Sequence, residues 1–149
     1  MNFVKTLATA ALIASLSAPA FAETFTFTAI PDQDDSALKA RFGKIANYLT
    51  KELGVEVKYI PVKSYSAAVT AFRNNQVQLA WFGGLSGARA RNLVKGSQAI
   101  AQGAEDKAFK TYFIAHTSTG LKNSSSFPKS MAGKTFTFGS KGSTSGRLM

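Results

Sequence analysis

Cysteine is absent from the 149 residues, and histidine occurs once, at His116. Without cysteine the chain can form neither a disulfide framework nor a thiolate metal site. A transition-metal site is also disfavoured, because a single histidine has no second nitrogen ligand, and no cofactor is expected. Stability must come from an apolar core, for which 45% hydrophobic residues and 12 phenylalanines are available.

Long apolar runs are also absent, since none reaches the roughly 20 residues that a bilayer-spanning helix needs. A shorter apolar run follows Lys5 and precedes a small-x-small pattern that ends at Ala22. This arrangement is typical of a secretory signal peptide. We therefore predict that residues 1–22 are a signal peptide, cleaved after Ala22, and that the product is exported to a bacterial periplasm.

Carboxylates are missing after Asp106, whereas seven basic residues occur from Lys107 onward. The formal charge of the chain is +10. Export and the scattered positions of the lysines disfavour nucleic acid as a partner. Two explanations of the charge asymmetry stay open, an anionic small-molecule ligand and an acidic remainder that this chain lacks.

Apolar periodicity predicts strands and helices in alternation. Strands are predicted at 24–30, 55–62 and 77–82. The helix after the first strand should have Asp35 or Ser36 as its N-cap, and the next two helices should start at about Tyr65 and at Leu85. The first helix should pack through Leu38, Phe42, Ile45, Leu49 and Leu53 and end before Gly54. Further strands are predicted at 98–102, 111–116 and 134–138, with a short turn or helix near 128–131. Alternating elements predict an α/β fold with a parallel or mostly parallel sheet.

In open α/β sheets, ligands bind where the carboxyl ends of the strands meet the following loops. The loop from Gly139 to Ser145 is the most distinctive of these, because glycines precede three adjacent hydroxyl residues, Ser143, Thr144 and Ser145. If the hydroxyls open a helix, free N–H groups, the helix dipole and the hydroxyls together form an anion cradle. A simple helix cap followed by a tail is the alternative.

Other loop residues support a site at the same edge, with structural roles as their alternatives. Trp81 and Gly83 lie at the end of the third strand, Tyr65 follows the second, and Tyr112 lies in the predicted fifth. The Gly139–Ser145 loop lacks the Gly-Lys-Ser/Thr ending of a P-loop, so a nucleotide site is disfavoured. It resembles a nucleophile elbow only loosely, because Thr144 replaces the central serine.

The order and spacing of several short motifs resemble the periplasmic substrate-binding proteins of phosphonate, phosphite and phosphate ABC transporters. The motifs are Ala29-Ile30-Pro31, Leu53-Gly54-Val55, Val62-Lys63-Ser64-Tyr65, Leu79-Ala80-Trp81-Phe82-Gly83, and Phe138-Gly139 with Ser143-Thr144-Ser145-Gly146. Pro31-Asp32-Gln33-Asp34 together with Trp81-Phe82-Gly83-Gly84-Leu85 looks most similar to the subgroup labelled as selenate binders.

The resemblance implies a type II periplasmic-binding fold, in which two α/β lobes close on a tetrahedral oxyanion. Residues 23–115 would form the N-terminal part of lobe 1, and residues 116–149 the hinge and the start of lobe 2. It also implies that this chain is an N-terminal fragment, with lobe 1 incomplete, and whether the fragment binds alone is left open. The implied ligand-binding residues are Tyr65, Tyr112, Ser143, Thr144, Ser145, Gln33, Trp81 and Gly83.

The implied function is that of a binding protein, not an enzyme. Its partners would be a small oxyanion, such as phosphonate, phosphite, phosphate or selenate, and an ABC permease at the inner membrane. Two alternatives stay open, an exported serine hydrolase using Ser143 or Ser145 and a basic module that binds anionic polymers.

Overall fold

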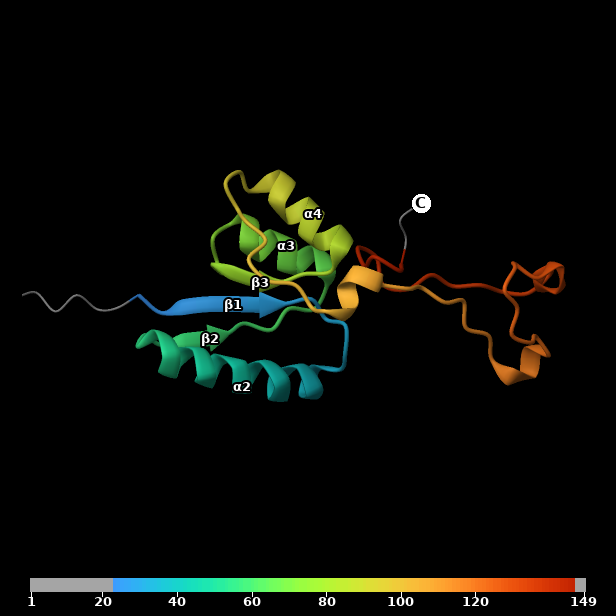
Figure 1. Cartoon of the computed structure of the whole chain (residues 1–149), viewed down its shortest axis with the longest axis horizontal. Coiled ribbons are helices and arrows are strands. Elements are labelled where there is room, and N and C mark those ends of the chain that lie inside the picture. Colours follow the sequence, from blue (N-terminus) through green and yellow to red (C-terminus); the bar gives the residue numbers. More distant parts are fainter. Residues whose placement is uncertain (1–22, 147–149) are drawn as a thin grey trace, which may run out of the picture.

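The computed structural model describes residues 23–146, so the predicted signal peptide lies outside the described residues. The described elements follow the predicted βαβαβα order (Figure 1). They are β1 (Phe25–Ala29), α2 (Asp35–Leu53), β2 (Val57–Tyr59), α3 (Tyr65–Arg73), β3 (Leu79–Trp81) and α4 (Gly84–Leu93). Three 3₁₀ helices come after them, at Glu105–Ala108, Thr117–Thr119 and Lys129–Met131. The last of these confirms the turn predicted near 128–131.

The three strands form one parallel sheet in the order β2-β1-β3. Because the chain moves from β1 to β2 on one side and then back across β1 to β3, right-handed crossovers place the connecting helices on opposite faces. Figure 1 shows this arrangement, with α2 on one face of the sheet and α3 and α4 on the other. The predicted α/β class with a parallel sheet is confirmed.

The central strand β1 is buried on both faces. Phe27 and Ala29 pack with Leu38 and Phe42 of α2, whereas the alternate residue Thr28 points to the other face and is fully buried. Its hydroxyl donates to the backbone carbonyl of Ile60 at 2.6 Å. A buried hydroxyl is tolerated when it has such an acceptor, which explains how a strand of alternating pattern can lie at the centre of the sheet.

Two details predicted for α2 are wrong. The N-cap is Asp34, not Asp35 or Ser36, because the Asp34 carboxylate accepts the amides of Ser36 and Ala37 at 3.0 and 2.9 Å. The buried stripe is Leu38, Phe42 and Ala46, while Ile45 and Leu53 of the predicted face are exposed. A three-stranded sheet offers α2 only a narrow surface, so the flanking apolar residues are left in solvent. Gly54 follows the helix in the left-handed conformation, as predicted.

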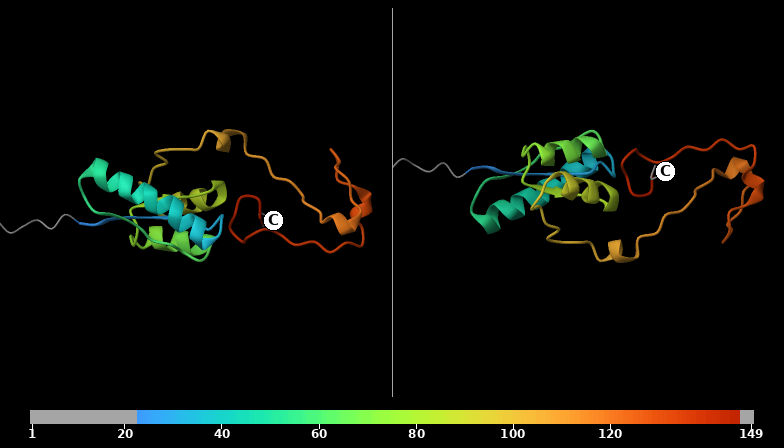
Figure 2. Two further views of the ribbon diagram at one scale, coloured as in Figure 1. Left: turned by 90° about the horizontal axis from the view of Figure 1, so that it is seen from below. Right: turned by 90° about the horizontal axis from the view of Figure 1, so that it is seen from above.

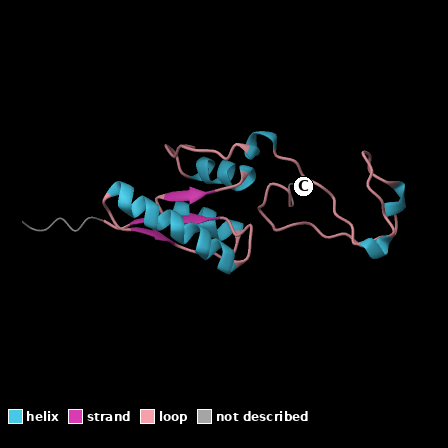
Figure 3. Cartoon of the chain, turned by 60° about the horizontal axis from the view of Figure 1, so that its bottom comes forward, coloured by secondary structure: helices cyan, strands magenta, loops and turns pink. Residues whose placement is uncertain are grey.

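The strands predicted at 98–102, 111–116 and 134–138 do not form (Figure 3). Apolar residues in them are exposed, with Ile100 at 76% and Ile114 at 93%. Phe113 instead contacts Phe127 and Phe136 in a small aromatic group away from the sheet. A strand is stabilised by hydrogen bonds to a neighbouring strand, and no partner strand lies beside these segments among residues 23–146. Their alternating pattern alone therefore does not make them strands.

The chain beyond α4 therefore leaves the sheet and comes back. Residues 94–139, which we call the connector, extend away without regular strands. The chain then returns as a turn near the carboxyl ends of the strands, as both views in Figure 2 show. Within residues 23–146, the helices are too short or too polar to cross a membrane.

Candidate functional site

The loops after β1 and β3 meet at one point of the sheet edge. These strands are neighbours that are not consecutive in sequence, so the edge between them is the topological switch point where α/β proteins bind ligands. A Cβ built on Gly83 would lie 3.4 Å from Cδ1 of Ile30. Close packing of the two loops thus forms the floor of the candidate site.

The N-terminus of α4 is held by its own sequence. Gly83 is the N-cap, and the buried hydroxyl of Ser86 accepts the Gly83 amide at 3.1 Å and contacts the Gly83 carbonyl oxygen at 3.2 Å. These contacts fix the backbone around Gly83 and Gly84. The helix predicted from Leu85 begins one residue earlier, at Gly84, and the role of Ser86 as a cap was not predicted.

The residues predicted to open a helix form consecutive turns instead. The Ser143 amide donates to the carbonyl of Ser140 at 3.1 Å, and the Gly146 amide donates to the carbonyl of Ser143 at 3.3 Å. Gly142 has φ of 92°, the left-handed conformation that glycine adopts most easily. Among the described residues, the amides of Thr144 and Ser145 donate no hydrogen bond, so the turn still presents free donors. We call residues 140–146 the cradle.

The cradle packs against the N-termini of both α3 and α4. The Thr144 hydroxyl oxygen accepts the backbone N–H of Leu85 at 3.2 Å, although 59 residues separate the two. At the other side, a Cβ built on Gly142 would lie 3.0 Å from Cβ of Tyr65, the first residue of α3. The fold thus brings together Tyr65, Gly83, Ser143 and Thr144, four of the predicted site residues.

Tyr65 is buried, with 8% of its surface exposed. Burial, followed by the negative charge of Asp32, raises the pKa of its phenol above the ordinary value of 10.0. The phenol is therefore protonated at neutral pH and available as a neutral hydrogen-bond donor. Asp32 lies on the loop after β1, and its influence on Tyr65 was not predicted from the sequence.

The other predicted site residues lie elsewhere. Trp81 pairs with Ala29 in register, so it points to the α2 face of the sheet, and 39% of it is exposed because β3 is an edge strand. Tyr112 lies in the connector with 73% of its surface exposed. Gln33, on the loop after β1, and Ser145, at the tip of the cradle, are also exposed. Their roles in binding stay predictions.

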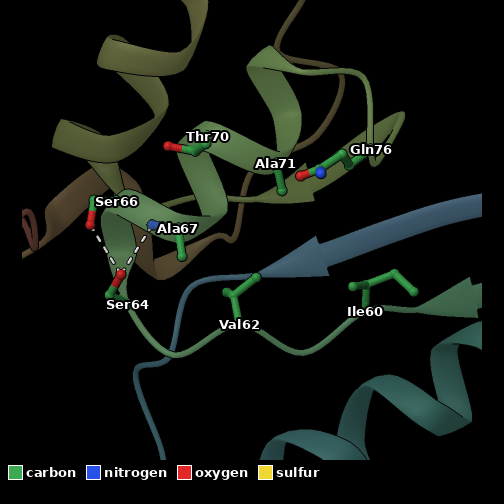
Figure 4. A pocket seen from close by; sticks show the side chains of 8 residues that line it. All are labelled: Ile60, Val62, Ser64, Ser66, Ala67, Thr70, Ala71 and Gln76. Carbon is green, nitrogen blue, oxygen red and sulfur yellow. Dashed lines mark hydrogen bonds between the residues drawn. The ribbon is translucent and has the colours of Figure 1, made fainter.

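Two hollows are lined by residues of α3. Figure 4 shows the larger, a groove of about 610 Å³ between the segment after β2 and α3, lined by Ile60, Val62, Ser64, Ser66, Ala67, Thr70, Ala71 and Gln76. The second, of about 380 Å³, runs between α3 and α4 and reaches Tyr65, Ser86, Arg89 and Gly142. The first contains none of the predicted site residues, while the second touches the back of the cradle.

Comparison with known proteins identifies the family. Residues 27–149 match the model of the periplasmic substrate-binding proteins of phosphonate ABC transporters. The chain belongs to this family. A probable ABC transporter phosphite-binding protein, PhnD1 of Prochlorococcus marinus MIT 9301, is 45% identical over 142 residues, and the phosphate-import protein PhnD of Mycolicibacterium smegmatis is 30% identical over 141 residues.

A solved structure gives the same result for the fold. The structure of PhnD1 from P. marinus in complex with methylphosphonate superposes with a TM-score of 0.66 at 40% sequence identity, over 84% of this chain and 47% of that one. The matches to the two curated relatives cover 93% and 90% of this chain but 48% and 42% of the relatives. The chain therefore spans about half the length of the curated relatives that it matches.

Proposed function

We propose that the protein is the substrate-binding component of an ABC importer and that it binds a tetrahedral oxyanion of the phosphonate, phosphite and phosphate class. The observation that carries the proposal is the position of the cradle. It lies across the N-termini of α3 and α4, at the switch point of a parallel sheet, with Thr144 against Leu85 and Gly142 against Tyr65.

The donors at this point suit an oxyanion. The amides of Thr144 and Ser145, the Tyr65 phenol and two helix N-termini all present partial positive charge. A tetrahedral anion offers several oxygens in different directions, so donors that converge from three chain segments can each reach one. The names of the relatives, a phosphite-binding protein and a phosphate-import protein, and the methylphosphonate bound by PhnD1 agree with this class.

The cradle hydroxyls do not favour the alternative of a serine hydrolase. The Ser143 hydroxyl donates to the carbonyl of Ser140 at 2.8 Å rather than to a base. His116, the single histidine, is bonded locally through Nδ1 to the amide of Ser118 at 3.2 Å. A nucleophilic serine needs a base within hydrogen-bond reach, and the relatives are binding proteins.

Calorimetry on the full-length protein tests the proposal. Methylphosphonate, phosphite, phosphate and selenate are titrated separately, and at least one should bind. The double variant Ser143→Ala/Thr144→Ala should weaken that binding about 50-fold. It removes the Thr144 hydroxyl, whose proton can be donated to the anion in a bond that contributes about 1.5 kcal/mol or more, and the Ser143 hydroxyl, whose bond to the Ser140 carbonyl holds the turn and contributes about 1 kcal/mol.

The matched control is Ser118→Ala/Thr119→Ala. It removes an adjacent serine and threonine whose hydrogen bonds are confined to the connector, and it should leave the affinity unchanged. If the protein binds none of these oxyanions but binds an amino acid, the proposed ligand class is wrong.

Export and transport are part of the same proposal. The family is periplasmic by description, and the segment before Glu23 has the pattern of a signal peptide. Delivery of the ligand to a permease at the inner membrane would complete the role. Loss of oxyanion uptake on deletion of the gene, restored by the wild-type gene, is the expected result, and unchanged uptake would contradict it.

A further inference from the structure

We propose that Thr144 is a positioning residue that caps α4 from a distance and thereby locks the cradle onto the helix. The part of the inference that concerns ligand release rests on the proposed function, whereas the contact itself does not. It assigns to Thr144 a task beyond that of a ligand donor, since one hydroxyl can accept the Leu85 N–H while its proton is donated elsewhere.

The start of α4 lacks a side-chain cap of the usual kind. The first amides of a helix have no intrahelical acceptor, and an N-cap serine, threonine, aspartate or asparagine normally accepts one of them. Here the N-cap is Gly83, which has no side-chain oxygen. Thr144 supplies the missing acceptor, because its Oγ1 takes the N–H of Leu85 at 3.2 Å.

Gly83 and Gly84 leave space for the Thr144 side chain. A Cβ built on Gly83 would lie 3.3 Å from Oγ1 of Thr144, and one built on Gly84 would lie 3.4 Å from Oγ1 and 3.6 Å from Cγ2. The hydroxyl and the methyl group of Thr144 therefore border the space that a side chain at either glycine would enter. A Cβ at Gly83 would press more tightly on the hydroxyl than most Cβ contacts do, so the contact favours a bare backbone at this position.

Little else fixes the cradle to the sheet. The connector that leads to it forms no strand with β1, β2 or β3 among the described residues, and much of it is exposed. The contacts at Leu85 and at Tyr65 are therefore the ones that set the distance between the cradle and the helical layer. Loss of the Thr144 contact should let the cradle move away from α4.

The first test needs no ligand. In the full-length protein, amide hydrogen exchange at Leu85 is followed by NMR for Thr144→Val, which keeps the shape but has no hydroxyl, and for Thr144→Ser, which keeps the hydroxyl. Exchange should be about fivefold or more faster in Thr144→Val and close to wild type in Thr144→Ser, as expected for the loss of one net hydrogen bond. Equal exchange in all three proteins overturns the inference.

The second test removes the donor instead. Leu85→Pro deletes the N–H in the first turn of α4, where proline is tolerated, and the preceding Gly84 has no Cβ to clash with the ring. Leu85→Ala loses the same leucine side chain but retains the N–H, so the two variants are compared with each other. Methylphosphonate, or the oxyanion that binds in calorimetry, should dissociate about fivefold faster from Leu85→Pro than from Leu85→Ala.

The outcomes separate this inference from the proposed function. If the protein binds the oxyanion and the two Leu85 variants release it at equal rates, the Thr144–Leu85 hydrogen bond does not affect ligand release. The proposed function would still stand. If the wild-type protein binds no oxyanion but exchange still differs between Thr144→Val and Thr144→Ser, the proposed function is wrong. The inference that Thr144 caps α4 would still be supported.

Discussion

Gly142 is the residue at which the cradle meets α3. Its φ of 92° disfavours any L side chain, and an added Cβ would lie only 3.0 Å from Cβ of Tyr65. Backbone conformation and a close contact therefore both require glycine here. The contact matters for the proposed site, because Tyr65 is one of the proposed donors to the oxyanion.

Gly142→Ala in the full-length protein should weaken oxyanion binding about tenfold, because the turn must shift away from Tyr65 to accommodate the methyl group. The matched control is Gly120→Ala. Gly120 also has a left-handed φ, of 70°, but a Cβ there would have nothing within 4 Å, so this variant bears only the backbone strain of about 1 kcal/mol. Calorimetry should find weaker binding in Gly142→Ala alone, and equal affinities would contradict the assigned contact.

Among the elements, α2 is the longest helix of the described chain and begins at a carboxylate cap. The hydroxyl of Ser36 and then the amide of Ala37 lower the pKa of Asp34 from its ordinary value of 3.8. A carboxyl whose pKa is lower in the folded state stabilises the fold above its unfolded pKa. That stabilisation is lost as the pH falls through the folded pKa.

Asp34→Ala should therefore lower the melting temperature at pH 7, whereas Asp34→Asn retains a capping oxygen and should lower it less. Below about pH 4, the wild type should lose stability more steeply than Asp34→Asn, which has no carboxyl to titrate. Asp106→Ala is the control, because the Asp106 carboxylate accepts the amide of Gly103 at a short 3₁₀ helix only. Thermal unfolding monitored by circular dichroism measures all three, and equal melting temperatures for Asp34→Ala and the wild type at pH 7 would contradict the cap.

At the scale of the whole molecule, a small sheet with helices on both faces is joined to a long irregular connector. Phe113, Phe127, Phe136 and Phe138 of the connector are all at least 49% exposed. The relatives are about twice as long. The division into lobes at residues 115 and 116 stays a prediction, because the described connector forms no second sheet among residues 23–146.

Export is also a property of the whole molecule. Expressed in a Gram-negative bacterium, the full-length protein should be recovered from the periplasm with Glu23 as its first residue, as determined by mass spectrometry. Ala22→Leu should accumulate as a longer precursor, because the position before the cleaved bond requires a small side chain. A periplasmic product with a different first residue would show that the predicted cleavage site is wrong. An uncleaved product in the cytoplasm would show that the predicted export is wrong.

Sequence by itself determined the alternating elements as far as α4, the parallel α/β class and the family. Those features depend on local periodicity, on residues such as Gly54 after α2 and on the order of short motifs, all of which can be read along the chain. It also predicted Tyr65, Gly83, Ser143 and Thr144 as site residues; the structure brings them together, and their role in binding stays a prediction.

Tertiary structure alone decided which of these residues meet and which segments become strands. The alternating segments 98–102, 111–116 and 134–138 have strand patterns, but pairing is a contact between distant residues, and they have no partner strand among residues 23–146. The Thr144 contact with Leu85 spans 59 residues, and the Trp81 side chain points to the α2 face because of its register with Ala29. No local pattern encodes such distances, because they follow from how the sheet, its helices and the returning cradle pack together.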